Sequence, residues 1–71
     1  MNDKEWMIAE SEKRGLTPPT ENSLDAFQEK VGQSFDETNG NYPLNNIRED
    51  VFSLYTWGEI GDLPKYKVNK K

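Results

Sequence analysis

The side chains that most often carry out catalysis are absent from this sequence. It contains no histidine and no cysteine, which removes the commonest general base, the strongest nucleophile and the usual zinc ligands. No serine lies in a glycine-framed elbow or in a Ser-x-x-Lys pattern. Two carboxylates could in principle hydrolyse a glycoside, but a chain of 71 residues is too short to enclose a sugar cleft. We therefore expect no enzymatic activity, no catalytic residue and no bound cofactor.

The stretch from Asp36 to Asn46 mixes acids, asparagines and a glycine, as calcium-binding loops do. Its spacing does not fit such a loop. If Gly40 takes the sixth position, Phe35 and Asn46 fall at the first and twelfth, where calcium needs an Asp and a bidentate Glu. The glycines are also too widely spaced for a phosphate-binding loop. We interpret the stretch as a hydrogen-bonded turn and expect no metal site.

The segment from Trp57 to Pro64 is the strongest candidate for partner recognition. Its large apolar residues, Trp57, Ile60 and Leu63, are interrupted by two glycines, which disfavour a regular core-facing surface. Tryptophan is enriched at binding hot spots. We expect acidic residues at the rim of this surface: Glu49, Asp50, Glu59 and Asp62. The competing interpretation is that the apolar residues cap the core, since so short a chain has a thin core.

Charge is distributed unevenly along the chain. Residues 1–64 carry all thirteen acids and five of the nine basic residues, and the lysine-rich residues 65–71 carry the other four. We therefore divide the chain into a single helical domain, 1–64, and a basic C-terminal tail, 65–71. Nucleic-acid binders usually have a basic face on the folded domain, so we expect no direct nucleic-acid binding by the acidic body. Without a signal-peptide pattern or a long apolar run, we expect no membrane association and a cytoplasmic location.

Two helices are predicted in the first half of the sequence. Asn2 and Glu5 form a capping-box pattern before a helix of about residues 3–14, and Gly15 is a typical helix terminator. The Thr-Pro-Pro-Thr connector that follows excludes helix. Asn22 or Ser23 can cap a second helix, whose apolar stripe comprises Leu24, Phe27, Val31 and Phe35. Because glycine is a poor helix former, this helix either ends near residue 31 or continues through Gly32 to about residue 35.

A third helix is predicted over about residues 47–57. Asn46 and Glu49 repeat the cap pattern, and apolar residues then recur at helical spacing until Gly58. The fold class we predict is mostly α, a compact three-helix small domain with an irregular C-terminal tail. The alternative is an α+β fold with a short hairpin between residues 42–44 and 66–68. Trp6 should close one end of a core made of Leu16, Leu24, Phe27, Val31, Phe35, Ile47, Val51, Leu54 and Tyr55.

Three functional hypotheses remain after these exclusions. The first is a small acidic protein-binding module, a regulator or inhibitor of a larger protein with a basic or apolar docking surface, of a kind typical of phage or mobile elements. The second is a nucleic-acid mimic that inhibits a DNA- or RNA-binding enzyme. The third is a structural or assembly subunit that forms a homo-oligomer, which the thin core makes credible.

Overall fold

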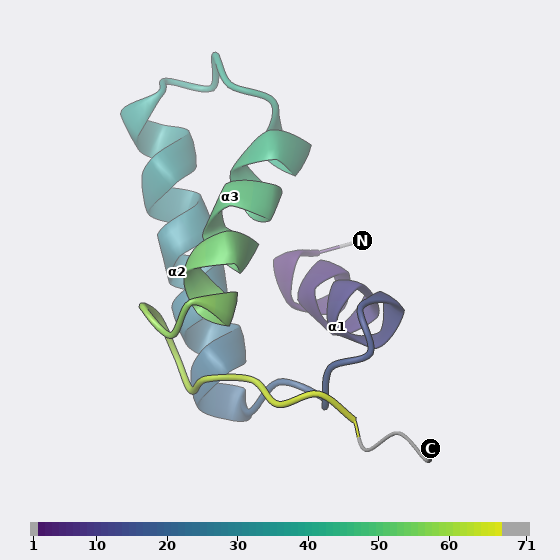
Figure 1. The fold of residues 1–71 in the computed structure, drawn as a ribbon. Helices are drawn as coiled ribbons and strands as arrows, with labels where there is room; N and C mark the ends of the chain where they lie inside the picture. The colour runs from purple at the N-terminus through teal and green to yellow at the C-terminus, as the bar shows by residue number, and fades with distance from the viewer. Residues whose placement is uncertain (1, 68–71) are drawn as a thin grey trace.

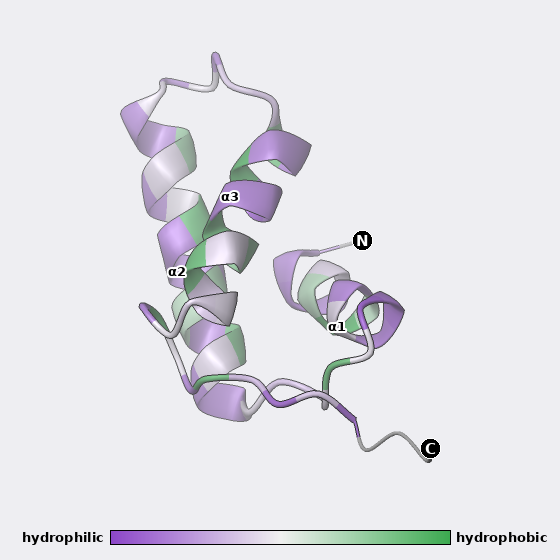
Figure 2. Cartoon of the chain, in the orientation of Figure 1, coloured by the Kyte–Doolittle hydropathy of each residue, from purple (hydrophilic) through white to green (hydrophobic). Residues whose placement is uncertain are grey.

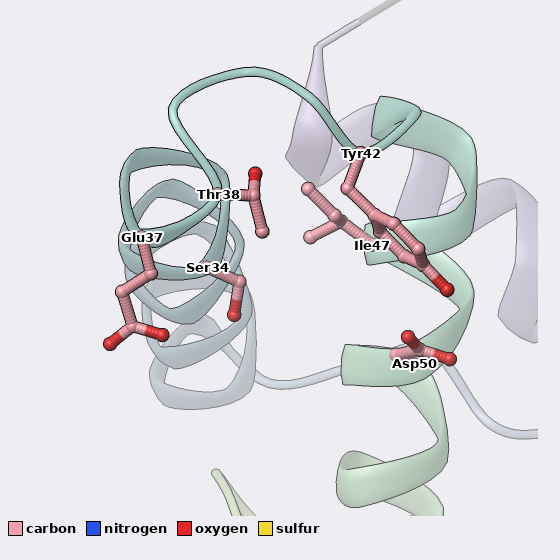
Figure 3. A pocket seen from close by; sticks show the side chains of 6 residues that line it. All are labelled: Ser34, Glu37, Thr38, Tyr42, Ile47 and Asp50. Carbon is pink, nitrogen blue, oxygen red and sulfur yellow. The ribbon is translucent and has the colours of Figure 1, made fainter.

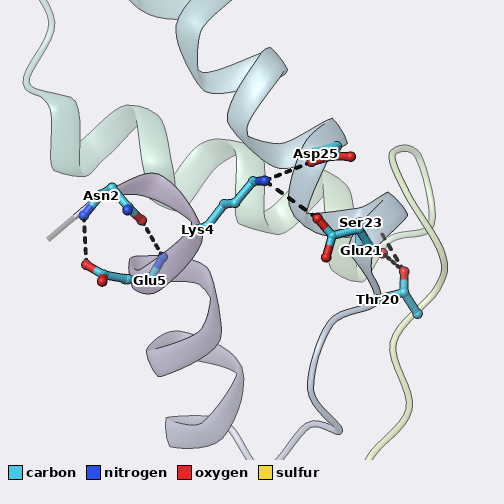
Figure 4. Close-up of polar contacts among 7 residues, drawn as sticks. All are labelled: Asn2, Lys4, Glu5, Thr20, Glu21, Ser23 and Asp25. Atoms are coloured by element: carbon cyan, nitrogen blue, oxygen red, sulfur yellow. Dashed lines mark hydrogen bonds and ion pairs between the residues drawn. The ribbon is translucent and has the colours of Figure 1, made fainter.

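The first helix, α1 (Asp3–Lys13), begins where the sequence predicts. The computed structural model describes residues 2–67. In it the Asn2 side chain accepts a hydrogen bond from the Glu5 backbone N–H at 2.8 Å, and the Glu5 carboxylate accepts one from the Asn2 N–H at 3.2 Å (Figure 4). The predicted capping box is thus confirmed. The helix stops at Lys13 rather than Arg14, and Gly15 then turns the chain with a φ of 76°.

The second helix, α2 (Glu21–Glu37), is capped by Thr20, so the predicted cap at Asn22 or Ser23 is wrong. The Thr20 hydroxyl oxygen accepts a hydrogen bond from the Ser23 N–H at 3.1 Å. The helix starts this early because Thr20 is the first residue after the two prolines, and its extended backbone is that of an N-cap. The helix also continues through Gly32, so packing of its buried face outweighs a propensity cost of about 1 kcal/mol.

The third helix, α3 (Leu44–Thr56), begins three residues earlier than predicted. Pro43 is its N-cap and no side chain caps it, so the capping role assigned to Asn46 and Glu49 is wrong. Asn46 already lies in the first turn, because its N–H donates to the Pro43 carbonyl at 3.1 Å. Trp57 is the C-cap residue and Gly58 follows with a φ of 83°.

The helices form a three-helix domain in which α2 packs against both α1 and α3. Figure 1 shows α2 and α3 side by side and antiparallel, joined by the loop of residues 38–43, with α1 beside them near the other end. Figure 2 shows that the apolar parts of α2 and α3 lie mainly where these helices face each other. The mostly α fold class is therefore confirmed. Within residues 2–67 no helix is long and apolar enough to cross a membrane.

The core lies between the three helices. Its buried apolar residues are Met7, Leu16, Phe27, Val31, Ile47, Val51, Phe52 and Tyr55, and Trp6 packs against them as predicted. Leu24 is half-buried and packs against this core as predicted, whereas Leu54 is half-buried and does not belong to the core. At 100° per residue, Phe52 and Leu54 point in nearly opposite directions, so burial of Phe52 leaves Leu54 at the edge.

Phe35 is the second residue of the predicted core that lies outside it, because 39% of its surface is exposed. It lies in the last turns of α2, where its ring is close to the turn at Gly40. A Cβ atom at Gly40 would stand 3.5 Å from the ring of Phe35. The stripe of the second helix is therefore buried over a shorter length than its spacing predicts.

Residues 58–67 form the irregular C-terminal segment. The end of this segment lies beside the connector that joins α1 to α2. Tyr66 forms an antiparallel bridge with Leu16, and the Lys67 N–H donates to the Gly15 carbonyl at 2.8 Å. The alternative fold with a hairpin between residues 42–44 and 66–68 is wrong, because Tyr66 pairs with Leu16. Val68, Lys70 and Lys71 of the predicted tail lie outside the described residues.

Candidate partner-binding surface

Trp57 is the most exposed large apolar side chain that the sequence singled out for binding. It follows the last turn of α3, and 78% of its surface is accessible to water. Its backbone is nevertheless held in place, because its N–H donates to the Ser53 carbonyl at 3.0 Å. The indole is therefore presented to solvent from the end of an ordered helix.

Leu63 lies beside the turn that follows Trp57 and is also exposed, at 64% of its surface. A Cβ atom at Gly58 would stand 3.2 Å from the Leu63 Cδ1 atom, so the missing side chain lets the leucine approach the end of α3. Gly58 also adopts a positive φ, which disfavours other residues at this position. We call Trp57 and Leu63 together the Trp57 patch.

Ile60 does not belong to this patch, although the sequence placed it there. It is half-buried and packs against the hydrophobic core. The interpretation that the apolar residues of this segment cap the core is therefore correct for Ile60 and wrong for Trp57 and Leu63. The chain reverses at the glycines on either side of Glu59 and Ile60, which lets one apolar side chain turn inward while its neighbours turn outward.

The four acidic residues expected at the rim are not gathered around Trp57. Glu49 and Asp50 are exposed on the first half of α3, and at 1.5 Å per residue they lie roughly 11 Å along the helix axis from Trp57. Glu59 is exposed two residues after Trp57. Asp62 serves a different purpose, because it fixes the C-terminal segment to α2.

The contacts of Asp62 anchor this segment at the start of α2. Its carboxylate accepts a hydrogen bond from the Thr20 hydroxyl at 2.6 Å, and its backbone N–H donates to the Ser23 hydroxyl at 2.8 Å. Gly61 makes this approach possible, since a Cβ atom there would stand 2.8 Å from the Ser23 Cα atom. The segment after Trp57 is thus held by polar contacts that do not involve the indole. Sequence reasoning missed this anchor because Asp62 lies about 40 residues from Thr20 and Ser23.

Tyr55, a titratable residue near this anchor, is buried. Burial raises the pKa of the Tyr55 hydroxyl, an effect that a hydrogen bond with Ser23 opposes and that the Asp62 charge reinforces. Among residues 2–67, no three acidic side chains come close enough to hold a metal ion. The surface therefore offers an apolar patch rather than a cluster of reactive groups.

The comparisons with known proteins identify no relative of this chain. No protein-family model matches it, and neither a curated protein nor a solved structure matches it.

Proposed function

We propose that this chain is a small protein-binding module, a regulator or inhibitor that docks on a larger protein through the Trp57 patch. The observation that supports this proposal is the 78% exposure of Trp57 on an ordered helix end. In a chain with so few apolar residues, an indole left in water forgoes the stabilisation that burial would provide. Binding to a partner would recover that stabilisation.

The geometry of Trp57 is well suited to a hot spot. Such residues contribute about 2 kcal/mol or more when they are buried at an interface, and tryptophan is enriched among them. A side chain on an ordered backbone loses little backbone entropy when it binds. Leu63, whose side chain lies close to Gly58, adds exposed apolar area near the same helix end. A partner that offers an apolar pocket would therefore gain most from these two residues.

The acidic composition favours a partner with basic residues around that pocket. The chain has a formal net charge of −4, and long-range attraction would speed the encounter more than it would strengthen the complex. The complex should therefore survive salt that screens the charges, because the apolar contact does not depend on them. A cytoplasmic partner is part of this proposal.

Nucleic-acid mimicry is the weaker proposal. A mimic needs a continuous face of unpaired carboxylates, whereas several acids here already have cationic neighbours. The Lys4 ammonium lies 2.9 Å from the Asp25 carboxylate and 3.7 Å from that of Glu21 (Figure 4). Lys67 similarly pairs with Glu12 at 3.1 Å. These pairs reduce the negative charge that a phosphate-binding groove would meet.

The test is affinity capture with three immobilised baits: wild type, Trp57→Ala and Ile8→Ala. Ile8 is the matched control, because it is an exposed apolar residue on α1. We expect a specific protein that wild type and Ile8→Ala retain equally and that Trp57→Ala loses by at least about tenfold, as for a hot-spot residue. Equal retention by all three folded baits would contradict the proposal. Sedimentation of the free chain would show whether the captured protein is a second copy.

A further inference from the structure

A second surface feature lies at the opposite end of α3 from the Trp57 patch. A cleft of about 280 Å³ opens between the end of α2 and the beginning of α3 (Figure 3). Residues from both helices and from the connecting loop line it: Ser34, Glu37, Thr38, Tyr42, Ile47 and Asp50. Pockets for small organic ligands usually measure about 300–1,000 Å³. This cleft is therefore better suited to one side chain of a partner than to a cofactor.

The apolar part of the cleft consists of Ile47 and Tyr42. Ile47 belongs to the buried core, whereas Tyr42 is 44% exposed and can be reached from solvent. Figure 3 shows the Tyr42 ring extending from the loop alongside Ile47, with its hydroxyl end directed toward Asp50. A guest side chain would thus meet an aromatic ring and an aliphatic side chain before it reached the carboxylate.

The charged part of the cleft is entirely negative. Glu37 and Asp50 are exposed, and neither forms an ion pair within residues 2–67. Among the described residues, no lysine or arginine lines the cleft. Lys30, one turn before Ser34 on α2, lines a different hollow together with Ile60. The acids in the cleft therefore lack the cationic neighbours that other acids of this chain have.

We propose that this cleft receives the side chain of a lysine or arginine carried by a partner protein. Both side chains combine an apolar stem with a charged head, which matches an apolar wall that leads to the Asp50 carboxylate (Figure 3). The exposed face of Tyr42 adds a cation–π contact. A neutral apolar side chain would leave the Asp50 carboxylate without a partner, and an acidic one would be repelled. The charge of the lining thus selects a cationic guest.

This inference goes beyond the proposed function, because it uses residues that the Trp57 patch does not contain. The two features can therefore be tested separately. If both are correct, the partner presents an apolar pocket for Trp57 and a basic residue for the cleft. If the Trp57 patch binds no partner, the cleft is still expected to bind cationic peptides.

The test is an NMR titration of the ¹⁵N-labelled chain with the peptide acetyl-Gly-Lys-Gly-amide and with its norleucine counterpart. Norleucine keeps the apolar stem and lacks the charge. We expect the lysine peptide to shift the amide signals of the six lining residues and the norleucine peptide to leave them unchanged. The arginine peptide should act like the lysine peptide, and both should bind weakly, since a single side chain is engaged.

Three variants assign the binding to the cleft. Asp50→Asn should lower the affinity for the lysine peptide about two- to fivefold, as the loss of one exposed ion pair does. Tyr42→Leu should lower this affinity by a similar factor, because the cation–π contact is lost. Glu49→Gln is the matched control, because Glu49 adjoins Asp50 on α3 and does not line the cleft. Trp57→Ala should bind the peptide as tightly as wild type.

Two results would overturn the inference. The first is a lysine-peptide titration that leaves the signals of the lining residues unchanged. The second is an equal weakening by Glu49→Gln and Asp50→Asn, with shifts spread over exposed acids elsewhere such as Glu29, which would indicate unspecific attraction to a negative chain.

Discussion

The two tryptophans of this chain occupy opposite environments. The Trp6 ring stacks on Phe27 with 5.8 Å between ring centroids and an interplanar angle of 7°, and it forms a T-shaped pair with Phe52 at a centroid distance of 6.0 Å. The guanidinium of Arg14 covers the Phe52 ring at 4.9 Å. Trp57 has no ring contact of this kind within residues 2–67 and remains 78% exposed.

This difference separates two uses of aromatic residues in a small domain. The Trp6 region is a cluster in which each ring fills space between helices, and such contacts contribute stability beyond simple burial. The region around Trp57 is ordered by other means, namely the last turn of α3 and the anchor at Asp62. Stability should therefore depend on the first region, whereas partner binding should depend on the second.

The largest expected effect comes from breaking the Trp6 region with Phe27→Ala. Loss of this fully buried ring should cost about 3–5 kcal/mol in the free energy of unfolding. The whole free energy of unfolding of a chain of this length is roughly 4–11 kcal/mol. Urea unfolding monitored by circular dichroism measures the loss. Phe35→Ala, on the same helix but exposed, should cost less than half as much; equal losses would contradict the assigned core.

A smaller effect is expected from Gly61→Ala, which disturbs the anchor of the segment after Trp57. The new Cβ atom would stand 2.8 Å from Ser23 Cα, and the backbone φ of 64° is strained for alanine. We expect a loss of about 1–3 kcal/mol in the same unfolding experiment. Gly32→Ala is the control, because that helical glycine has open space around it; it should gain about 0.5–1 kcal/mol.

Alkaline pH provides a milder test of the aromatic cluster. Tyr55 meets the Phe52 ring at 5.4 Å, and burial raises its pKa above the ordinary value of 10.0. The folded chain therefore holds this proton at pH values where the unfolded chain has released it. Stability should be unaffected below about pH 10 and should fall as the pH rises further. Tyr55→Phe should reduce this fall; an identical decline in the variant would assign it to other groups.

The smallest effect on folding is expected from Trp57→Ala. Exposed residues without strong contacts usually change stability by less than about 0.5 kcal/mol, so the unfolding midpoint should stay close to that of wild type. Trp6→Ala, which removes a ring stacked in the core, is the informative comparison and should be clearly destabilising. A similar large loss in both variants would place Trp57 in the core.

The sequence predicted most of the fold because its strongest signals are local. The capping box at Asn2, the terminator Gly15 and the periodic apolar residues of the third helix each act within a few residues. Errors arose where a constraint overrode a local preference. Two prolines brought the cap of α2 forward to Thr20. The sequence left two ends open for this helix, and the structure selects the alternative that continues through Gly32.

The candidate sites were harder to predict because they depend on contacts between distant residues. Trp57 was recognised by residue type, but its exposure follows from a turn in which Ile60 points inward and Leu63 outward. The role of Asp62 requires Thr20 and Ser23, which lie far away in the sequence. The cleft around Tyr42 and Asp50 forms only when the ends of two helices meet, and no sequence pattern marks it.

Photo-crosslinking at position 57 tests the central claim most directly. A chain with p-benzoylphenylalanine in place of Trp57 keeps a large aromatic group at the site and forms a covalent bond to whatever contacts it. Irradiation in the host cell should yield one predominant protein adduct from position 57 and none from the same group at Ile8, which is exposed on α1. Adducts of equal yield and composition at both positions, or none at position 57, would contradict the assignment of this patch as the docking surface.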